Sequence, residues 1–150
     1  MKEAATATEH ASAVLIGSRA ALIRGPAGSG KSRLAWALID AAAAGLLRFA
    51  RLVSDDRVEL TASHGRLLIR APAALAGLIE VRGVGVRRLA YEAVAVAGLV
   101  IDLGAADSER IPAPSAQTAE ISGIRLPRLP VATGADALSA VLATLNSEPT

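Results

Sequence analysis

The 150-residue sequence contains no cysteine, which excludes disulfides, thiolate zinc sites and cysteine nucleophiles and suits a cytoplasmic protein. Its net charge is only +2, its basic residues are scattered and 2% of it is aromatic, so nucleic acid is not an expected partner. No membrane partner is expected either, because the longest apolar run, 93–101, is far shorter than the roughly 20 residues of a spanning helix.

We expect a single domain over residues 1–150, in which residues 1–9 are disordered and do not have the apolar core of a signal peptide. The first predicted strand is 13–16. A turn at 17–19 joins it to a second strand at 20–23, so the two strands should form a hairpin.

The second strand runs into a phosphate-binding loop that matches the pattern G-x-x-x-x-G-K-S without a mismatch. Its glycines let backbone N–H groups turn toward phosphate oxygens, Lys31 reaches the β- and γ-phosphates, and the Ser32 hydroxyl holds Mg²⁺. A predicted helix from Lys31 to about Ala44 places the phosphates at a helix N-terminus. A chance glycine-rich turn is the alternative, but strand, loop and helix together argue against it. The expected nucleotide-binding residues are Gly25, Pro26, Ala27, Gly28, Ser29, Gly30, Lys31 and Ser32.

A predicted strand at 51–54 ends at two adjacent carboxylates, Asp55 and Asp56. The carboxyl end of a strand beside a phosphate loop is where a catalytic base or a Mg²⁺ ligand would lie. Neighbouring side chains on an extended chain point to opposite sides, so at most one of the two should face the phosphates. A solvated turn is the alternative interpretation.

The remaining elements predict a mixed sheet. Strands at 57–61 and 66–70 form a second hairpin, and a valine-rich central strand, apolar on both faces, occupies 93–103. Glu80 lies in the apolar stretch 78–86, where a carboxylate needs a partner; Arg82 and a metal ion are the two alternatives. The other predicted elements are a short helix from Pro72, an extended segment at 127–130 and a last helix capped by Thr133 or Asp136.

Taken together, these pieces resemble the catalytic domain of the bacterial HPr kinase/phosphorylase family. Four segments match it in order: 9–16, which contains His10, the phosphate loop within 22–32, the L-V-S-D-D-R-V-E-L segment at 52–60, and the L-I-E-V-R-G-V-G-V signature at 78–86. The last motif is not shared with phosphate-loop kinases in general. The resemblance implies an α/β phosphate-loop domain with a mixed central sheet, of the HPr kinase / PEP carboxykinase-like class, in a shortened form without the family's N-terminal domain.

The resemblance also implies an activity and its residues. The chain would be a cytoplasmic, ATP- and Mg²⁺-dependent kinase that phosphorylates a serine of the phosphocarrier HPr and so regulates a phosphotransferase system. Asp56 would take the proton from the serine hydroxyl, Lys31 would hold the phosphates with His10 nearby, and Ser32 and Glu80 would hold Mg²⁺. The best match to the family's downstream catalytic arginine is Arg110.

Departures from the family pattern bear on the phosphorylase activity, which is the reverse reaction, and on the formation of oligomers. Residues 41–49 look like an insertion, 87–91 replace a glycine-rich segment, and the C-terminal region is shorter. We therefore expect weak phosphorylase activity, and the resemblance leaves a homo-oligomer open.

Two other functions compete with this interpretation. A small-molecule or nucleotide kinase would need a lid and a nucleoside-binding segment that the sequence does not show. The second competing function is a non-catalytic module in which bound nucleotide regulates a signalling partner. It stays open because a phosphate loop indicates nucleotide binding rather than turnover.

Overall fold

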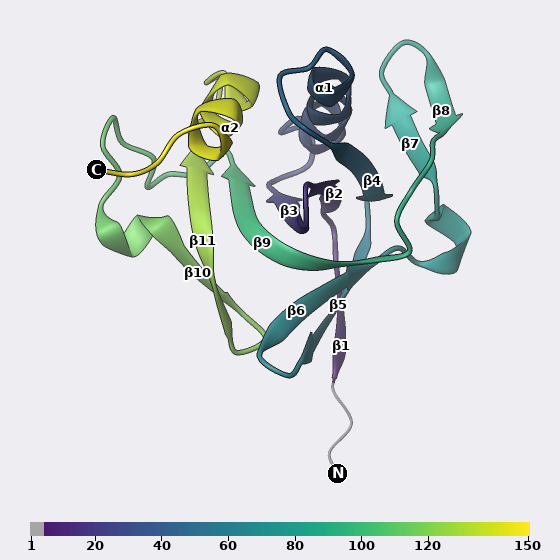
Figure 1. Ribbon diagram of the computed structural model, residues 1–150, viewed down its shortest axis with the longest axis horizontal. Helices are drawn as coiled ribbons and strands as arrows, with labels where there is room; N and C mark the ends of the chain where they lie inside the picture. Colours follow the sequence, from purple (N-terminus) through teal and green to yellow (C-terminus); the bar gives the residue numbers. More distant parts are fainter. Residues whose placement is uncertain (1–4) are drawn as a thin grey trace.

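The structure, a computed structural model, describes residues 5–150. Within this range a curved, mixed sheet of nine strands packs against two helices, and a two-stranded hairpin lies at one side (Figure 1). The strand order is β1-β5-β6-β9-β3-β2-β4, and β11 pairs with both β9 and β10. The sheet strands are β1 (Thr6–Glu9), β2 (Ser12–Ile16), β3 (Arg19–Arg24), β4 (Ala50–Ser54), β5 (Val58–Ser63), β6 (Arg66–Arg70), β9 (Val94–Leu103), β10 (Thr118–Ile121) and β11 (Ile124–Val131). The hairpin is β7 (Leu78–Val81) and β8 (Gly85–Arg88), and the helical elements are α1 (Lys31–Ala43), α2 (Ala137–Leu145) and the 3₁₀ turns η1 (Ala73–Leu75) and η2 (Pro114–Gln117).

Strand β9 connects the two halves of the sheet. Its first residues pair antiparallel with β6, and its later residues pair parallel with β3 and β11. Val100 and Ile101 are both fully buried, and they belong to hydrophobic cores on opposite faces of the strand. The prediction of a central strand that is apolar on both faces is therefore confirmed.

Strand direction brings the phosphate loop and the carboxylate pair to one edge of the sheet. Strand β2 lies between β3 and β4 and pairs antiparallel with both, so β3 and β4 run in the same direction. The phosphate loop follows β3, and Asp55–Asp56 follow β4. The carboxyl ends of both strands therefore point to the same place, as expected for a ligand site in an α/β sheet.

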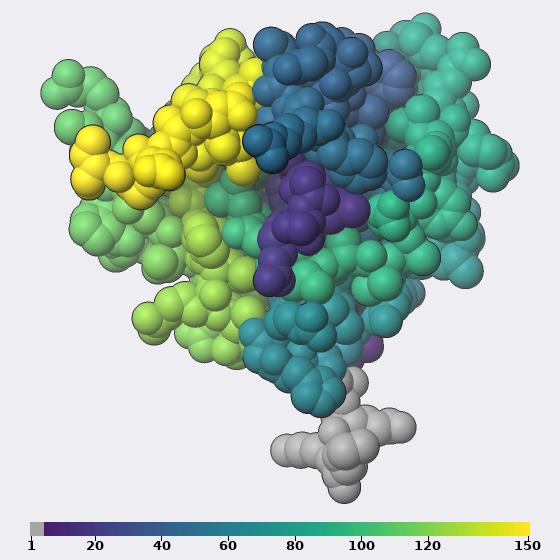
Figure 2. Space-filling model, in the orientation of Figure 1, coloured from purple at the N-terminus to yellow at the C-terminus, as the bar shows by residue number. Residues whose placement is uncertain are grey.

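Helix α1 packs on the hydrophobic core that contains Ile101, and its other face is turned away from this core. Of the apolar face expected from the 3.6-residue period, Leu34, Ala35 and Leu38 are buried and Ile39 and Ala42 are partly buried, and Ala41 is buried in addition. The end of the helix before Gly45, which has a φ of +82°, also agrees with the prediction. On the face seen in Figure 2, α1 lies between α2 and the β7–β8 hairpin. Of the two caps left open for the last helix, Asp136 is the one used, since its Oδ1 accepts the Ser139 N–H at 3.1 Å.

The expected disorder of residues 1–9 is wrong for residues 6–9. These residues form β1, which pairs antiparallel with β5 from Thr6↔Thr61 to Glu9↔Val58. An edge strand of this kind is stabilised by backbone hydrogen bonds to a distant partner, so its exposed side chains show no hydrophobic pattern. Residues 1–4 lie outside the described residues. None of the helices in the described range is long and apolar enough to cross a membrane.

Candidate functional site

The phosphate loop, residues 25–32, connects the end of β3 to the first turn of α1. Gly28 and Gly30 have φ values of +79° and +98°, which L side chains rarely adopt, whereas a β-carbon at either position would meet no atom within 4 Å. Backbone conformation rather than crowding therefore requires these glycines. Among the described residues no side chain caps α1 at Gly30, so its first-turn N–H groups can bind an anion.

Two polar side chains of the loop fit a phosphate group. The Ser29 Oγ is buried and has no hydrogen-bond partner among residues 5–150, which is unusual for a buried hydroxyl. The Lys31 Nζ donates to the carbonyl oxygens of Gly25 at 2.7 Å and Pro26 at 3.2 Å, so the ammonium group is held at the loop. A phosphate oxygen would satisfy the Ser29 hydroxyl and offer Lys31 a charged acceptor, which makes a stronger hydrogen bond than a carbonyl.

Asp55 is a buried carboxylate that joins four elements around the phosphate loop. It is 4% exposed, and its Oδ1 accepts the hydroxyls of Ser12 on β2 and Ser32 on α1, each at 2.7 Å. Its Oδ2 accepts the backbone N–H of Glu80 on β7 at 3.1 Å. These three donors compensate for the burial of the charge. They also fix the orientation of the Ser32 hydroxyl, the group expected at Mg²⁺.

Of the pair, Asp56 lies on a cavity in front of the phosphate loop, although the two residues occupy a bend after β4 rather than the extended chain that the prediction assumed. Asp56 is exposed and lines this cavity together with His10 from the connection between β1 and β2. Its φ of +69° is uncommon for a residue other than glycine. Such conformations are often found at functional sites, where the surrounding structure holds them in place.

The predicted apolar stretch 78–86 forms β7 and the start of β8, and its alternation tests the pairing of Glu80 with Arg82. Ile79 is 1% exposed and packs in the core beneath α1, whereas Glu80 is exposed and turns toward the cavity. No ion pair between Glu80 and Arg82 is formed in the described structure, although both side chains line the cavity. A buried Glu80–Arg82 pair is therefore wrong.

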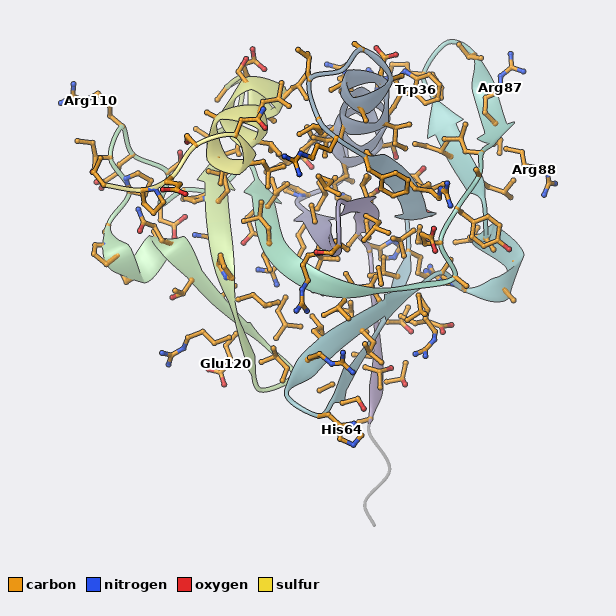
Figure 3. All side chains as sticks on the ribbon, in the orientation of Figure 1. Trp36, His64, Arg87, Arg88, Arg110 and Glu120 are labelled. Atoms are coloured by element: carbon orange, nitrogen blue, oxygen red, sulfur yellow. The ribbon has the colours of Figure 1, made fainter. Side chains whose placement is uncertain are left out.

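One open cavity of about 880 Å³ collects most of the predicted site residues. Its lining comprises His10, Gly25, Ala27, Gly28, Ser29, Gly30, Lys31, Ser32, Arg33, Trp36, Asp56, Glu80, Val81 and Arg82. Arg110 is not among them. It is exposed on the segment between β9 and η2, and Figure 3 shows it on the side of the molecule opposite the β7–β8 hairpin. Among the described residues, the lysine and arginines that line the cavity are instead Lys31, Arg33 and Arg82.

The sequence interpretation missed several residues of this site. The role of Asp55 in holding Ser32 depends on Ser12 and β7, which are distant in the sequence, so pattern alone could not assign it. Arg33 and Trp36 could have been found, because residues three apart on the predicted helix share a face, and these two lie between its regularly spaced apolar residues.

A cluster of charges fixes the start of the phosphate loop from the opposite face of the sheet. Arg24, which directly precedes the loop, makes a bidentate pair with Asp102 on β9 at 2.7 and 2.9 Å. The Nε of Arg128 on β11 donates to the same carboxylate at 2.6 Å. Burial raises the pKa of Asp102, but the hydrogen bonds from Arg24 and Arg128 outweigh it, so the pKa lies below its ordinary value. The cluster ties the carboxyl end of β3 to β9 and β11.

Comparison with known proteins agrees with this geometry. The HPr kinase/phosphorylase of Clostridium beijerinckii is 42% identical over 65 residues, which are 43% of this chain and 19% of that protein. The HPr kinase/phosphorylase of Clostridium botulinum strain Eklund 17B is 40% identical over a segment of the same length. The chain thus matches about a fifth of the length of these relatives.

The fold comparison covers nearly the whole chain. The structure of the HPr(Ser) kinase/phosphatase from Coxiella burnetii superposes with a TM-score of 0.73 and 25% identity, covering 93% of this chain and 88% of that one. The predicted α/β fold with a mixed central sheet is confirmed. The family described as HPr Serine kinase C-terminal domain matches residues 2–144. The predicted resemblance is confirmed as well, and the chain belongs to the HPr serine kinase C-terminal domain family.

Proposed function

We propose that this chain is an ATP-dependent protein-serine kinase that phosphorylates the phosphocarrier HPr and so regulates a phosphotransferase system in the cytoplasm. One observation carries the proposal: a single cavity joins a complete phosphate loop to Asp56 and Glu80, two carboxylates that phosphate binding alone does not require. The family relationship and the names of the relatives support HPr as the substrate.

The phosphate loop would bind the nucleotide through its backbone N–H groups and the Ser29 hydroxyl. Lys31 would exchange the carbonyls of Gly25 and Pro26 for the β- and γ-phosphates, which as anions are the better acceptors. Arg33 and Arg82 line the same cavity and add positive charge near the phosphates. This charge would stabilise the transferring group.

Ser32 and Glu80 are the residues that would hold Mg²⁺, with Asp55 keeping the Ser32 hydroxyl in position. Held there, the metal would supply positive charge to the transferring phosphates. One carboxylate, Glu80, lies with Ser32 in the same cavity lining. This suits Mg²⁺, which is usually bound through one or two carboxylates plus substrate phosphates and water.

Asp56 would act as the general base. It would take the proton from the substrate serine hydroxyl as the serine oxygen bonds to the γ-phosphorus. The bond from that phosphorus to the bridging oxygen breaks, and ADP leaves with the electron pair. Asp56 suits this role because it is exposed on the cavity, whereas Asp55 already accepts three hydrogen bonds.

The test is to incubate the protein with Mg-ATP and HPr and to look for phosphoserine on HPr by mass spectrometry. Phosphoserine that disappears with Asp56→Asn supports the proposal. Nucleotide binding without any transfer would favour the non-catalytic module, and ATP turnover that leaves HPr unmodified would favour a small-molecule kinase.

A further inference from the structure

The cavity extends past the phosphates along helix α1. Arg33 and Trp36 line it next to Lys31 and Ser32, and their three-residue spacing places them on one face of the helix. The core of the protein uses a different face of α1, which carries Leu34, Ala35, Leu38 and Ala41. Trp36, the single tryptophan of the chain, therefore does not pack in the core, and 38% of its surface is exposed.

The position of Trp36 suits a ligand that continues beyond a triphosphate. It lies about 7.5 Å along the helix axis from Lys31, at roughly 1.5 Å per residue. Figure 3 shows it on the side of α1 toward the β7–β8 hairpin, and Val81 of β7 lines the same cavity. Among the described lining residues, Trp36 and Val81 are the only large apolar side chains. They offer the only sizeable apolar surface for a flat, uncharged group.

We propose that Trp36 forms the nucleobase subsite of this chain, where the indole ring stacks on the base of the bound nucleotide. Arg33 then lies between the phosphate loop and the base, beside the α-phosphate and the ribose. This inference rests on the proposed nucleotide binding. Because every base presents a π-face to an aromatic ring, the subsite accepts ATP and GTP with similar affinity.

A structural role for Trp36 is the competing explanation, since its side chain could hold the β7–β8 hairpin against α1. The two roles differ in what they do to a ligand without a base. Loss of stacking weakens only nucleosides and nucleotides, whereas displacement of β7 also shifts Glu80, Arg82 and the Asp55 contact, and so weakens inorganic tripolyphosphate too.

Calorimetry with ATP, GTP and tripolyphosphate, each with Mg²⁺, therefore tests the inference on four forms of the protein: wild type, Trp36→Ala, Trp36→Phe and Tyr91→Ala. Tyr91 is the matched control, because it is an aromatic side chain 45% exposed outside the cavity lining. We expect Trp36→Ala to lose roughly 5- to 100-fold in affinity for ATP and GTP, the range of one base–aromatic stack, with tripolyphosphate binding unchanged. Trp36→Phe should retain most of the affinity, and Tyr91→Ala all of it.

A second readout needs no substitution. Because Trp36 is the only tryptophan, the intrinsic fluorescence of the wild type should be quenched by ATP and GTP and left nearly unchanged by tripolyphosphate. Equal affinity of wild type and Trp36→Ala for ATP, or an equal loss for ATP and tripolyphosphate, overturns the stacking role and leaves the proposed function standing. If neither ATP nor tripolyphosphate binds the wild type, the proposed function fails and the base subsite fails with it.

Discussion

The Ser32 hydroxyl donates a 2.7 Å hydrogen bond to Oδ1 of the buried Asp55, so the last residue of the phosphate loop is oriented by a carboxylate that does not face the cavity. Its neighbour Asp56 faces the cavity and makes none of these contacts. The pair therefore separates into a buried carboxylate that positions the Ser32 hydroxyl and an exposed carboxylate on the cavity, which is the proposed base.

This separation predicts different effects for the two conservative substitutions. Asp56→Asn should keep Mg-ATP bound and lower phosphoryl transfer roughly 10²- to 10⁴-fold, the usual contribution of a general base. Single-turnover transfer measured beside ATP affinity checks the prediction. If Asp55→Asn lowers transfer more than Asp56→Asn while leaving stability unchanged, the assignment of the base is reversed.

Asp55→Ala should instead destabilise the fold. It leaves two hydroxyls and the Glu80 N–H without their acceptor in a buried site, which should cost about 2 to 4 kcal/mol of the free energy of unfolding. Urea unfolding of Asp55→Ala and Asp56→Ala measures the contrast. Asp56→Ala is the matched control, since its side chain is exposed and its loss should cost little.

Nucleotide affinity should depend on Lys31. Lys31→Ala removes the ammonium at the β- and γ-phosphates and should abolish most Mg-ATP affinity. Lys31→Arg should recover little, because a planar guanidinium does not replace a compact ammonium inside the loop. Calorimetry that gives wild-type affinity for Lys31→Ala would falsify the assignment of the site.

Glu80 should act through Mg²⁺. Glu80→Gln keeps the size of the side chain and its backbone hydrogen bond to Asp55 but removes the charge, so half-maximal activity should require several-fold more Mg²⁺. Glu120→Gln is the control, because Glu120 is an exposed carboxylate on β10, far from the hairpin that carries Glu80 (Figure 3). An Mg²⁺ dependence that is identical in all three proteins would remove Glu80 from the metal site.

Acid stability should depend on the Arg24–Asp102–Arg128 cluster. The pKa of Asp102 is lower in the folded protein than in the unfolded chain, where it is about 3.9. The stabilising contribution of the Asp102 charge is therefore fully present above about pH 3.9 and is lost as the pH falls through the lower pKa of the folded protein. Asp102→Asn should cost about 2 to 3 kcal/mol at pH 7, because hydrogen bonds to charged groups are lost. The difference from wild type should shrink below about pH 4. A difference that stays constant from pH 7 to pH 3 in denaturant titrations would contradict this assignment.

The sequence predicted best those parts of the site that are close together along the chain. The phosphate loop and α1 are contiguous, and Gly28, Gly30, Lys31 and Ser32 have a local reason to be where they are, whereas Gly25 also lies close to Leu103 of β9. That at most one of the two aspartates faces the phosphate loop was also predicted, but from the alternation of an extended chain, whereas the pair lies in a bend in which Asp56 has a φ of +69°.

The parts that sequence reasoning missed depend on distant pairings. Strand β1 forms only because β5, about fifty residues away, offers an open edge. The exposed position of Arg110 depends on the long segment between β9 and η2, which carries no periodic pattern. The contact of Asp55 with Ser12 likewise depends on the packing of β2 against β4, which no local motif encodes.

The reverse reaction should be weak or absent. In that direction an oxygen of inorganic phosphate attacks the phosphorus of phosphoserine-HPr, Asp56 returns a proton to the leaving serine oxygen, and pyrophosphate is released.

The incoming phosphate needs additional positive charge in line with Asp56. Arg110, the expected source of that charge, lies on an exposed segment away from the cavity lining, and the two arginines that directly follow the signature, at the end of β8, are exposed. Mixing phosphoserine-HPr with millimolar phosphate and measuring pyrophosphate checks this prediction, with the forward reaction of the same preparation as the reference. Pyrophosphate release as fast as the forward transfer would show that the cavity supplies the charge that the second phosphate requires without Arg110.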